Sequence, residues 1–139
     1  MNAMLRITTH TFYVIAMCIC AVNASGCSGN DSIPSVSAIE FQKELKTDSV
    51  KLLDVRTPEE FAYGHIAGAI NINVQFDDFQ EKAEKELSKD SPIYVYCRSG
   101  RRSLTAARIL DRLGYKVVNL NGGIIEWKEE GLPITTIEK

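Results

Sequence analysis

The chain has 139 residues, of which 45% are hydrophobic and 24% are charged, and its formal net charge is −2. This length and composition suit one globular domain with a buried core, and they exclude both a disordered chain and one that is apolar throughout. The mildly acidic balance provides no global positive field to attract nucleic acid, so any site for an anion has to be local.

The first 26 residues differ from the rest because Arg6 is their only charged residue. Residues 12–22 form an unbroken apolar run, which is typical of a signal-peptide core and is short for a bilayer span. Small residues then precede Cys27, an arrangement that resembles a bacterial lipoprotein signal, in which the cysteine becomes the acylated first residue. A cleaved secretory signal and a retained membrane anchor are the alternatives. All three place the domain outside the cytoplasm, at the periplasmic or cell-envelope face.

Cysteine usage sharpens this expectation. Cys18 and Cys20 lie in the apolar run, where they serve as small hydrophobic residues. If Cys27 carries a lipid, Cys97 is the only free thiol of the mature protein. An unpaired cysteine in an oxidising compartment suggests reactivity or intermolecular pairing.

Three segments are therefore expected along the chain: a signal peptide over residues 1–26, a flexible tether over residues 27–36, and a folded domain over residues 37–137. The tether is rich in Ser, Gly, Asn and Asp and has little hydrophobic pattern. Ser37 and Glu40 form a capping box, which predicts a first helix that continues to about Lys46.

Two strands and two helices are expected between residues 50 and 87. Residues 50–55 form a short apolar run, and Thr57 to Glu60 is a second capping box with proline at the first helical position. Gly64 ends that helix, and residues 67–72 are typical of another small buried strand. Residues 77–87 predict a solvated helix with three charge pairs at helical spacing: Asp78 with Lys82, Glu81 with Lys85, and Lys82 with Glu86.

Residues 92–96 carry the strongest strand pattern in the chain, and Cys97 follows at the end of that strand. A helical pattern runs from Arg101 to Gly114, residues 116–120 predict a further strand, and residues 124–130 predict a last helix. Alternating strands and helices predict an α/β fold with a parallel sheet of about five strands and helices on both faces. Ligands of such sheets bind beyond the carboxyl ends of the strands, which is where this pattern puts Cys97.

The residues after Cys97 suit an anion. A thiol attacks as its thiolate, so the site has to stabilise negative charge. The turn formed by Ser99 and Gly100 can point backbone N–H groups inward, and the start of the following helix adds positive potential. Arg98, Arg101 and Arg102 can bind an oxyanion through paired hydrogen bonds. A packed cysteine flanked by solvated arginines is the simpler alternative, but the coincidence of all these features at the ligand edge favours a nucleophile.

The sequence here resembles the rhodanese domains. Residues 97–103 (CRSGRRS) match their active-site loop almost letter for letter, and three further family motifs occur in order at residues 53–61, 64–71 and 122–127. The likeness covers about residues 37–135. Each motif alone is weak, whereas the set is highly specific.

This resemblance implies sulfur transfer in two steps. Cys97 would take the outer sulfur of a donor such as thiosulfate and hold it as a persulfide, and a thiol or cyanide would then remove it. The loop amides of residues 98–102 would stabilise the persulfide, while Arg98 and Arg102 would help to bind the donor anion. The family implies neither a metal nor an organic cofactor, and a protein thiol is a further potential partner.

Other residues are expected to be structural. Asp54 and Arg56 could orient the loop, but such residues more often pair locally at a strand end. His65 lies in a turn, where histidine usually serves as hydrogen-bonded scaffold, and Trp127 suits core packing.

Three alternatives to the enzyme stay open. A phosphatase would need a Cys-x5-Arg spacing, but Ser103 occupies the sixth position after Cys97 and Arg102 comes one residue too early. A non-catalytic docking or regulatory module is compatible with the same fold. A persulfide carrier that exchanges sulfur with a partner protein would use the same chemistry.

Overall fold

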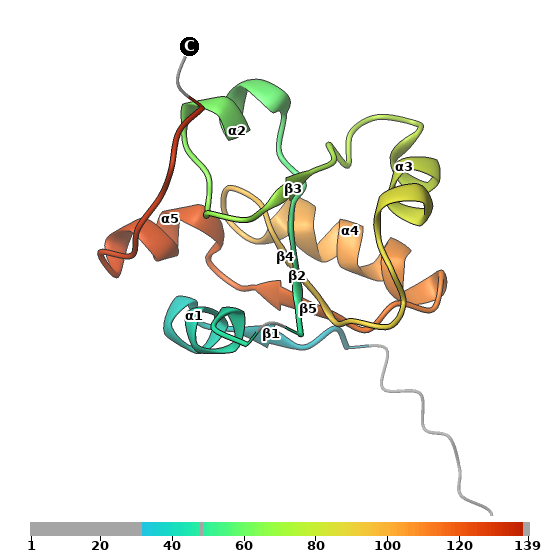
Figure 1. Ribbon diagram of the computed structural model, residues 1–139, viewed down its shortest axis with the longest axis horizontal. Coiled ribbons are helices and arrows are strands. Elements are labelled where there is room, and N and C mark those ends of the chain that lie inside the picture. The colour runs from blue at the N-terminus through green and yellow to red at the C-terminus, as the bar shows by residue number, and fades with distance from the viewer. Residues whose placement is uncertain (1–31, 48, 138–139) are drawn as a thin grey trace, which may run out of the picture. The chain divides into compact units, whose positions relative to one another are not determined.

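The computed structural model describes residues 32–47 and 49–137. Five parallel strands in this part of the chain form one sheet in the order β1-β5-β4-β2-β3 (Figure 1). The strands are β1 Ser35–Val36, β2 Lys51–Asp54, β3 Ile70–Asn71, β4 Ile93–Tyr96 and β5 Val117–Leu120. The helices are α1 Ala38–Leu45, α2 Pro58–Tyr63, α3 Phe79–Glu86, α4 Arg101–Arg112 and α5 Gly123–Glu129. The predicted α/β fold is confirmed.

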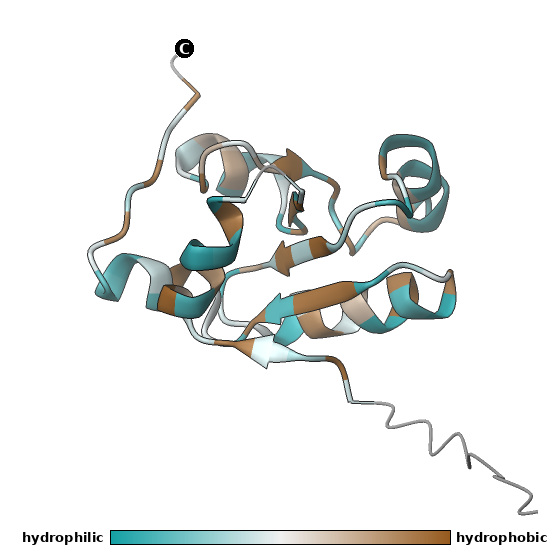
Figure 2. Ribbon diagram, turned by 60° about the horizontal axis from the view of Figure 1, so that its bottom comes forward, coloured by the Kyte–Doolittle hydropathy of each residue, from teal (hydrophilic) through white to brown (hydrophobic). Residues whose placement is uncertain are grey.

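The three central strands β2, β4 and β5 are largely buried on both faces because their side chains alternate between two core clusters. Leu53, Val95 and their neighbours pack with α3 and α4, whereas Leu52 and Tyr94 pack with α1 and α5 on the opposite face. Figure 2 shows hydrophobic stretches in the strands, interrupted by polar residues. Helices therefore cover both faces of the sheet, as the sequence predicted.

Capping boxes mark where two of the five described helices begin. Both predicted capping boxes are formed: Ser37 accepts from the backbone of Glu40 in α1, and Thr57 accepts from that of Glu60 in α2. By contrast, α4 starts after Gly100, which has a left-handed conformation and no capping side chain. This start is shaped by the loop that holds Cys97.

The predicted tether extends too far, because its last two residues belong to the sheet. Ser35 and Val36 form strand β1, which pairs with β5 at the edge of the sheet. Backbone hydrogen bonds from Asn119 N to Pro34 O (2.8 Å) and from Asn121 N to Val36 O (3.0 Å) hold it there. A two-residue strand beside a proline has too little pattern to be recognised locally, because its partner is distant in sequence.

The charged helix α3 forms only part of its predicted surface network. Lys82 and Asp78 form an ion pair at 2.9 Å, but the other two predicted pairs do not come within 4.0 Å of each other, although all four residues are described. Both side chains of the formed pair are about half exposed, so it contributes little to stability.

The predicted signal peptide, the first residues of the tether and the proposed lipid site Cys27 lie outside the described residues. Within residues 32–47 and 49–137, none of the helices is long and apolar enough to cross a membrane.

Candidate active site

Strand β4 delivers Cys97 to the carboxyl edge of the sheet. The strand pairs with β2 on one side and β5 on the other, so it lies near the middle of the sheet. Its four residues are all buried, and Cys97, which follows directly, is 1% exposed. The thiol is therefore fixed at the edge where parallel sheets bind their ligands.

Two hydrogen-bond donors point at the sulfur. The backbone N–H of Gly100 lies 3.2 Å from Cys97 Sγ, and the hydroxyl oxygen of Ser103 lies 3.3 Å from it. Ser103 is fully buried, and its single O–H faces two acceptors, because the hydroxyl also donates to the carbonyl oxygen of Gly100 at 3.1 Å. Donors to sulfur stabilise its negatively charged form, so this arrangement suits a thiolate or a persulfide anion.

The loop keeps its shape because two glycines allow the backbone to pack closely against the turn between β5 and α5. Gly100 has φ of 88°, and a Cβ placed there would lie 1.8 Å from the carbonyl oxygen of Asn121. Gly123 has φ of 62°, and its Cβ would lie 2.5 Å from the carbonyl oxygen of Arg98. The Ile124 N–H donates to the Cys97 carbonyl oxygen at 2.9 Å, which ties the two segments together.

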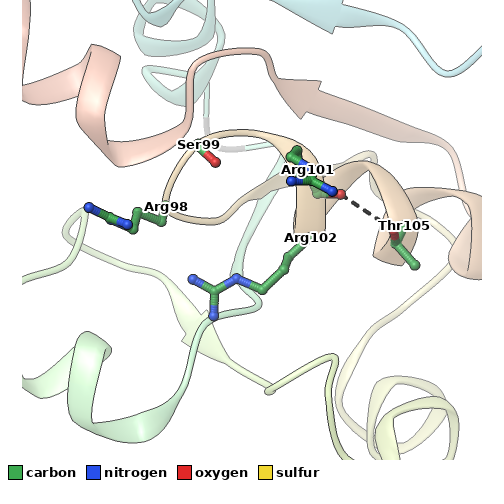
Figure 3. Close-up of a pocket in the computed structure, with 5 residues that line it drawn as sticks. All are labelled: Arg98, Ser99, Arg101, Arg102 and Thr105. Atoms are coloured by element: carbon green, nitrogen blue, oxygen red, sulfur yellow. Dashed lines mark hydrogen bonds between the residues drawn. The ribbon is translucent and has the colours of Figure 1, made fainter.

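A pocket of about 350 Å³ opens beside the loop (Figure 3). Arg98 and Ser99 reach it from the loop, and Arg101, Arg102 and Thr105 project from the first turns of α4. Arg98, Ser99 and Arg101 are exposed, whereas Gly100 is buried. The pocket is lined by Arg98, Ser99, Arg101, Arg102 and Thr105, so the structure brings all three predicted loop arginines to one polar surface.

Arg102 is already engaged by a carboxylate. Its Nη1 and Nη2 atoms donate to the two carboxylate oxygens of Glu60 in α2, each at 2.8 Å. These hydrogen bonds outweigh partial burial and lower the pKa of Glu60 to about 2, while the same pairing raises the pKa of Arg102. The expectation that Arg102 helps to bind the donor anion stays a prediction, and its guanidinium already holds a carboxylate.

Asp54 and Arg56 pair with each other, as predicted. The two side chains are almost completely buried and approach to 2.6 Å. Arg56 also donates to the carbonyl oxygen of Gly64 at 2.8 Å, and its guanidinium lies 5.6 Å from the ring centre of Tyr96. The pair thus connects the end of β2 to the end of α2 behind the loop.

The geometry of His65 and Trp127 agrees with their predicted structural roles. Nδ1 of His65 lies 2.9 Å from the carbonyl oxygen of Phe61, and its backbone forms two hydrogen bonds with Thr135. Trp127 is 2% exposed, and its Nε1–H donates to the Pro133 carbonyl oxygen at 2.9 Å. None of these hydrogen bonds involves the Cys97 sulfur.

Sequence reasoning missed three contributors. Ser103 served only to define the loop length, Glu60 was assigned only to a helix cap, and Glu126 was one residue of a motif. Glu126 accepts hydrogen bonds from Ala38 N and Gly122 N, which joins α1 to the turn beneath the loop. The Glu60 contact spans 42 residues of sequence, so no local spacing could reveal it. The hydroxyl of Ser103, by contrast, could be expected at the first turn of the helix after the thiol.

No group of three or more His, Cys, Asp or Glu side chains that could hold a metal occurs in the part of the chain that the structure describes. The groups that the site offers for chemistry are the thiol, the loop amides, the hydroxyl of Ser103 and the arginines.

Known proteins are similar to this chain in sequence and in fold. A family model described as a rhodanese-like domain matches residues 37–130. A sulfurtransferase of Allochromatium vinosum is 41% identical over 98 residues, which cover 70% of this chain and 89% of that protein. The putative sulfur carrier protein YrkF of Bacillus subtilis is 39% identical, over 69% of this chain and 51% of that protein. The crystal structure of a rhodanese-related protein from Thermoplasma volcanium is 37% identical, with a TM-score of 0.66, over 73% of this chain and 97% of that one.

Proposed function

The chain belongs to the rhodanese-like domain family, and from this premise we propose that it is a sulfurtransferase that carries sulfur as a persulfide on Cys97. Relatives named as sulfurtransferases and as a sulfur carrier support sulfur transfer as its general chemistry. The single observation that carries the proposal is the pair of donors, Gly100 N–H and Ser103 hydroxyl, that face the Cys97 sulfur.

The proposed reaction has two steps. The thiolate of Cys97 attacks the outer sulfur of a donor such as thiosulfate, a new S–S bond forms, and sulfite leaves with the electron pair of the old bond. An acceptor thiol or cyanide then attacks the outer sulfur of the persulfide, and the Cys97 thiolate is released. The Gly100 amide and the Ser103 hydroxyl stabilise the anionic sulfur in both the free and the loaded state.

The surface of the pocket supports a small sulfur-containing anion as the donor. Arg98 and Arg101 are exposed on the pocket wall, and no ion pair within 4.0 Å neutralises either of them among the described residues. Two guanidinium groups beside the loop provide bidentate donors for an oxyanion. Cys97 is 1% exposed, which favours donors that present a single sulfur atom over bulkier groups.

The persulfide carrier is the second candidate, and the similarity to YrkF favours it. Both candidates need the same loaded Cys97, and they differ only in whether the acceptor is a small molecule or a protein thiol.

A phosphatase is less compatible with the loop. Ser103 is buried against the sulfur at the position where such loops supply an arginine, so no guanidinium comes from there.

The proposal is tested by mixing the protein with several sulfane sulfur donors and measuring its intact mass. Wild type should gain the mass of one sulfur atom, peptide mapping should assign it to Cys97, and Cys97→Ser should gain none. If wild type stays unmodified with every donor, the non-catalytic docking module becomes the better account.

We further propose that the domain is exported and anchored by a lipid on Cys27. The apolar run over residues 12–22 and the small residues before Cys27 support this proposal. Cys27→Ala should lose membrane association in cell fractionation, whereas Cys20→Ala, a change within the apolar run, should keep it. Unchanged partitioning of Cys27→Ala would argue against the lipid anchor.

A further inference from the structure

The ion pair between Glu60 and Arg102 joins α2 to α4, two helices that are distant in sequence. Arg102 is also one of the residues that line the pocket beside the loop. Both Arg102 donors that face Glu60 are used at 2.8 Å, and one Glu60 oxygen also accepts from the Thr57 backbone at 3.1 Å. The two side chains keep 27% and 31% exposure, and Arg102 lines the pocket, so the carboxylate of Glu60 is bonded directly to a pocket residue. The paired N–H donors of the Arg102 guanidinium, which could bind an oxyanion, thus already bind a carboxylate of the protein itself.

The pair changes the charge that a donor meets. Three arginines line the pocket, but Glu60 compensates the charge of Arg102, which leaves Arg98 and Arg101 to attract an anion. The Coulomb energy of repulsion by the carboxylate scales with the donor charge, so it opposes a dianion twice as strongly as a monoanion. A thiol persulfide carries at most one negative charge on its reacting group.

Resting on the sulfur transfer proposed above, we infer that Glu60 is a specificity-determining residue that weakens dianionic sulfur donors and so favours persulfides carried on thiols. In the favoured step, the Cys97 thiolate attacks the outer sulfur of a persulfide R–S–S–H and forms a new S–S bond. The old S–S bond breaks with its electron pair on the departing thiolate R–S⁻, and the hydrogen stays on the transferred sulfur. No oxidant or reductant is consumed.

Two isosteric variants separate the ion pair from the general charge of the helix. Glu60→Gln removes the charge that faces Arg102, and glutamine can still serve as the third residue of the capping box. Glu59→Gln removes the same charge one residue earlier, from an exposed side chain that forms no ion pair within the described residues. Each is prepared in the full-length protein, and loading of Cys97 is followed with thiosulfate and with the persulfide of a small uncharged thiol.

In Glu60→Gln, the KM for thiosulfate should fall by about 3- to 10-fold at low ionic strength, because an exposed charge is partly screened. The KM for the persulfide should change by less than about twofold, and the advantage for thiosulfate should shrink as salt is added. Glu59→Gln should leave the ratio of the two KM values at that of wild type. The inference is overturned if Glu60→Gln leaves this ratio unchanged or weakens thiosulfate, because Glu60 would then merely orient Arg102. It is also overturned if Glu59→Gln changes the ratio equally.

A binding measurement that needs no turnover distinguishes this inference from the proposed function. Sulfate, an unreactive dianion, is titrated while the arginine side-chain N–H signals are followed by NMR. Sulfate should bind more tightly to Glu60→Gln by the same factor, and equal affinity in both proteins would overturn the role of Glu60. If neither donor loads Cys97 while the sulfate affinity still rises, the sulfur-transfer proposal fails and the electrostatic role of Glu60 stands.

Discussion

Ser103 shows how a single side chain complements the proposed nucleophile. Its hydroxyl lies 3.3 Å from Cys97 Sγ, and it is buried, so water does not readily replace it. A hydrogen bond to a charged group contributes about 1.5–3 kcal/mol, more than a bond between neutral groups. The hydroxyl therefore has most influence where the sulfur carries negative charge.

We expect Ser103→Ala to slow persulfide formation on Cys97 by roughly tenfold or more, because the attacking sulfur loses one of its two donors. The rate is measured by quenched-flow mixing with a sulfane donor and mass analysis. Ser99→Ala is the matched control, since Ser99 is exposed on the pocket and forms no hydrogen bond to the sulfur within the described residues. Equal rates in the two variants would contradict this role for Ser103.

Asp54 and Arg56 illustrate the opposite situation, in which burial makes a pair indispensable. Asp54→Asn would leave the Arg56 guanidinium buried without its counterion, a change that costs about 3–5 kcal/mol. Urea unfolding should show this loss. Asp78→Asn breaks the half-exposed pair with Lys82 and should change stability by less than about 1 kcal/mol. A small effect of Asp54→Asn would show that the buried pair is not essential for stability.

At the scale of elements, the loop after β4 and the turn after β5 form one packed unit. Gly100 allows this contact through both its positive φ and its missing side chain. The two effects are separable because Gly68 has a similar φ of 82°, but, among the described residues beyond its chain neighbours, no atom lies within 4 Å of the point that a Cβ would occupy there.

Gly100→Ala should therefore be destabilised by about 3 kcal/mol or more, since strain of the left-handed conformation adds to a clash with the Asn121 carbonyl group. Gly68→Ala should lose only the strain, about 1–2 kcal/mol. Denaturant unfolding of both variants gives the comparison. Equal losses would mean that the loop moves away from the turn without cost.

The contact between α2 and α4 makes stability depend on pH. Arg102 holds the pKa of Glu60 at about 2, below the value of about 4.3 for an unfolded glutamate. Because the pKa of Glu60 is lower in the folded protein, its ionised carboxylate stabilises the fold. This stabilisation is complete above about pH 4.3 and is lost as the pH falls through 2. Wild type should thus be more stable than Glu60→Gln by about 1 kcal/mol at neutral pH, after allowing for screening, and this difference should shrink as the pH falls through 2 and vanish below it. A constant difference across this range in urea unfolding would contradict the ion pair.

At the scale of the whole molecule, sequence patterns predicted several helices and strands whose cause is local. The capping boxes at Ser37 and Thr57 and the apolar run before Cys97 each predicted their elements, and their alternation predicted the parallel sheet. Strand β1 could not be predicted, because its two residues become a strand only by pairing with β5. The same reason applies to Glu60, whose bond to Arg102 depends on how α2 packs beside α4.

The fold as a whole holds the Gly100 amide and the Ser103 hydroxyl against the Cys97 sulfur, with the arginine-lined pocket beside the same loop, and this arrangement supports sulfur transfer through a Cys97 persulfide. The most direct test uses a donor with an isotopically labelled outer sulfur, followed by an unlabelled acceptor thiol or cyanide. The label should appear on the Cys97 peptide and then in the acceptor product at the same rate as it leaves the protein, and Cys97→Ser should transfer none. Labelled product that forms without a labelled Cys97 peptide, or in Cys97→Ser, would contradict the account.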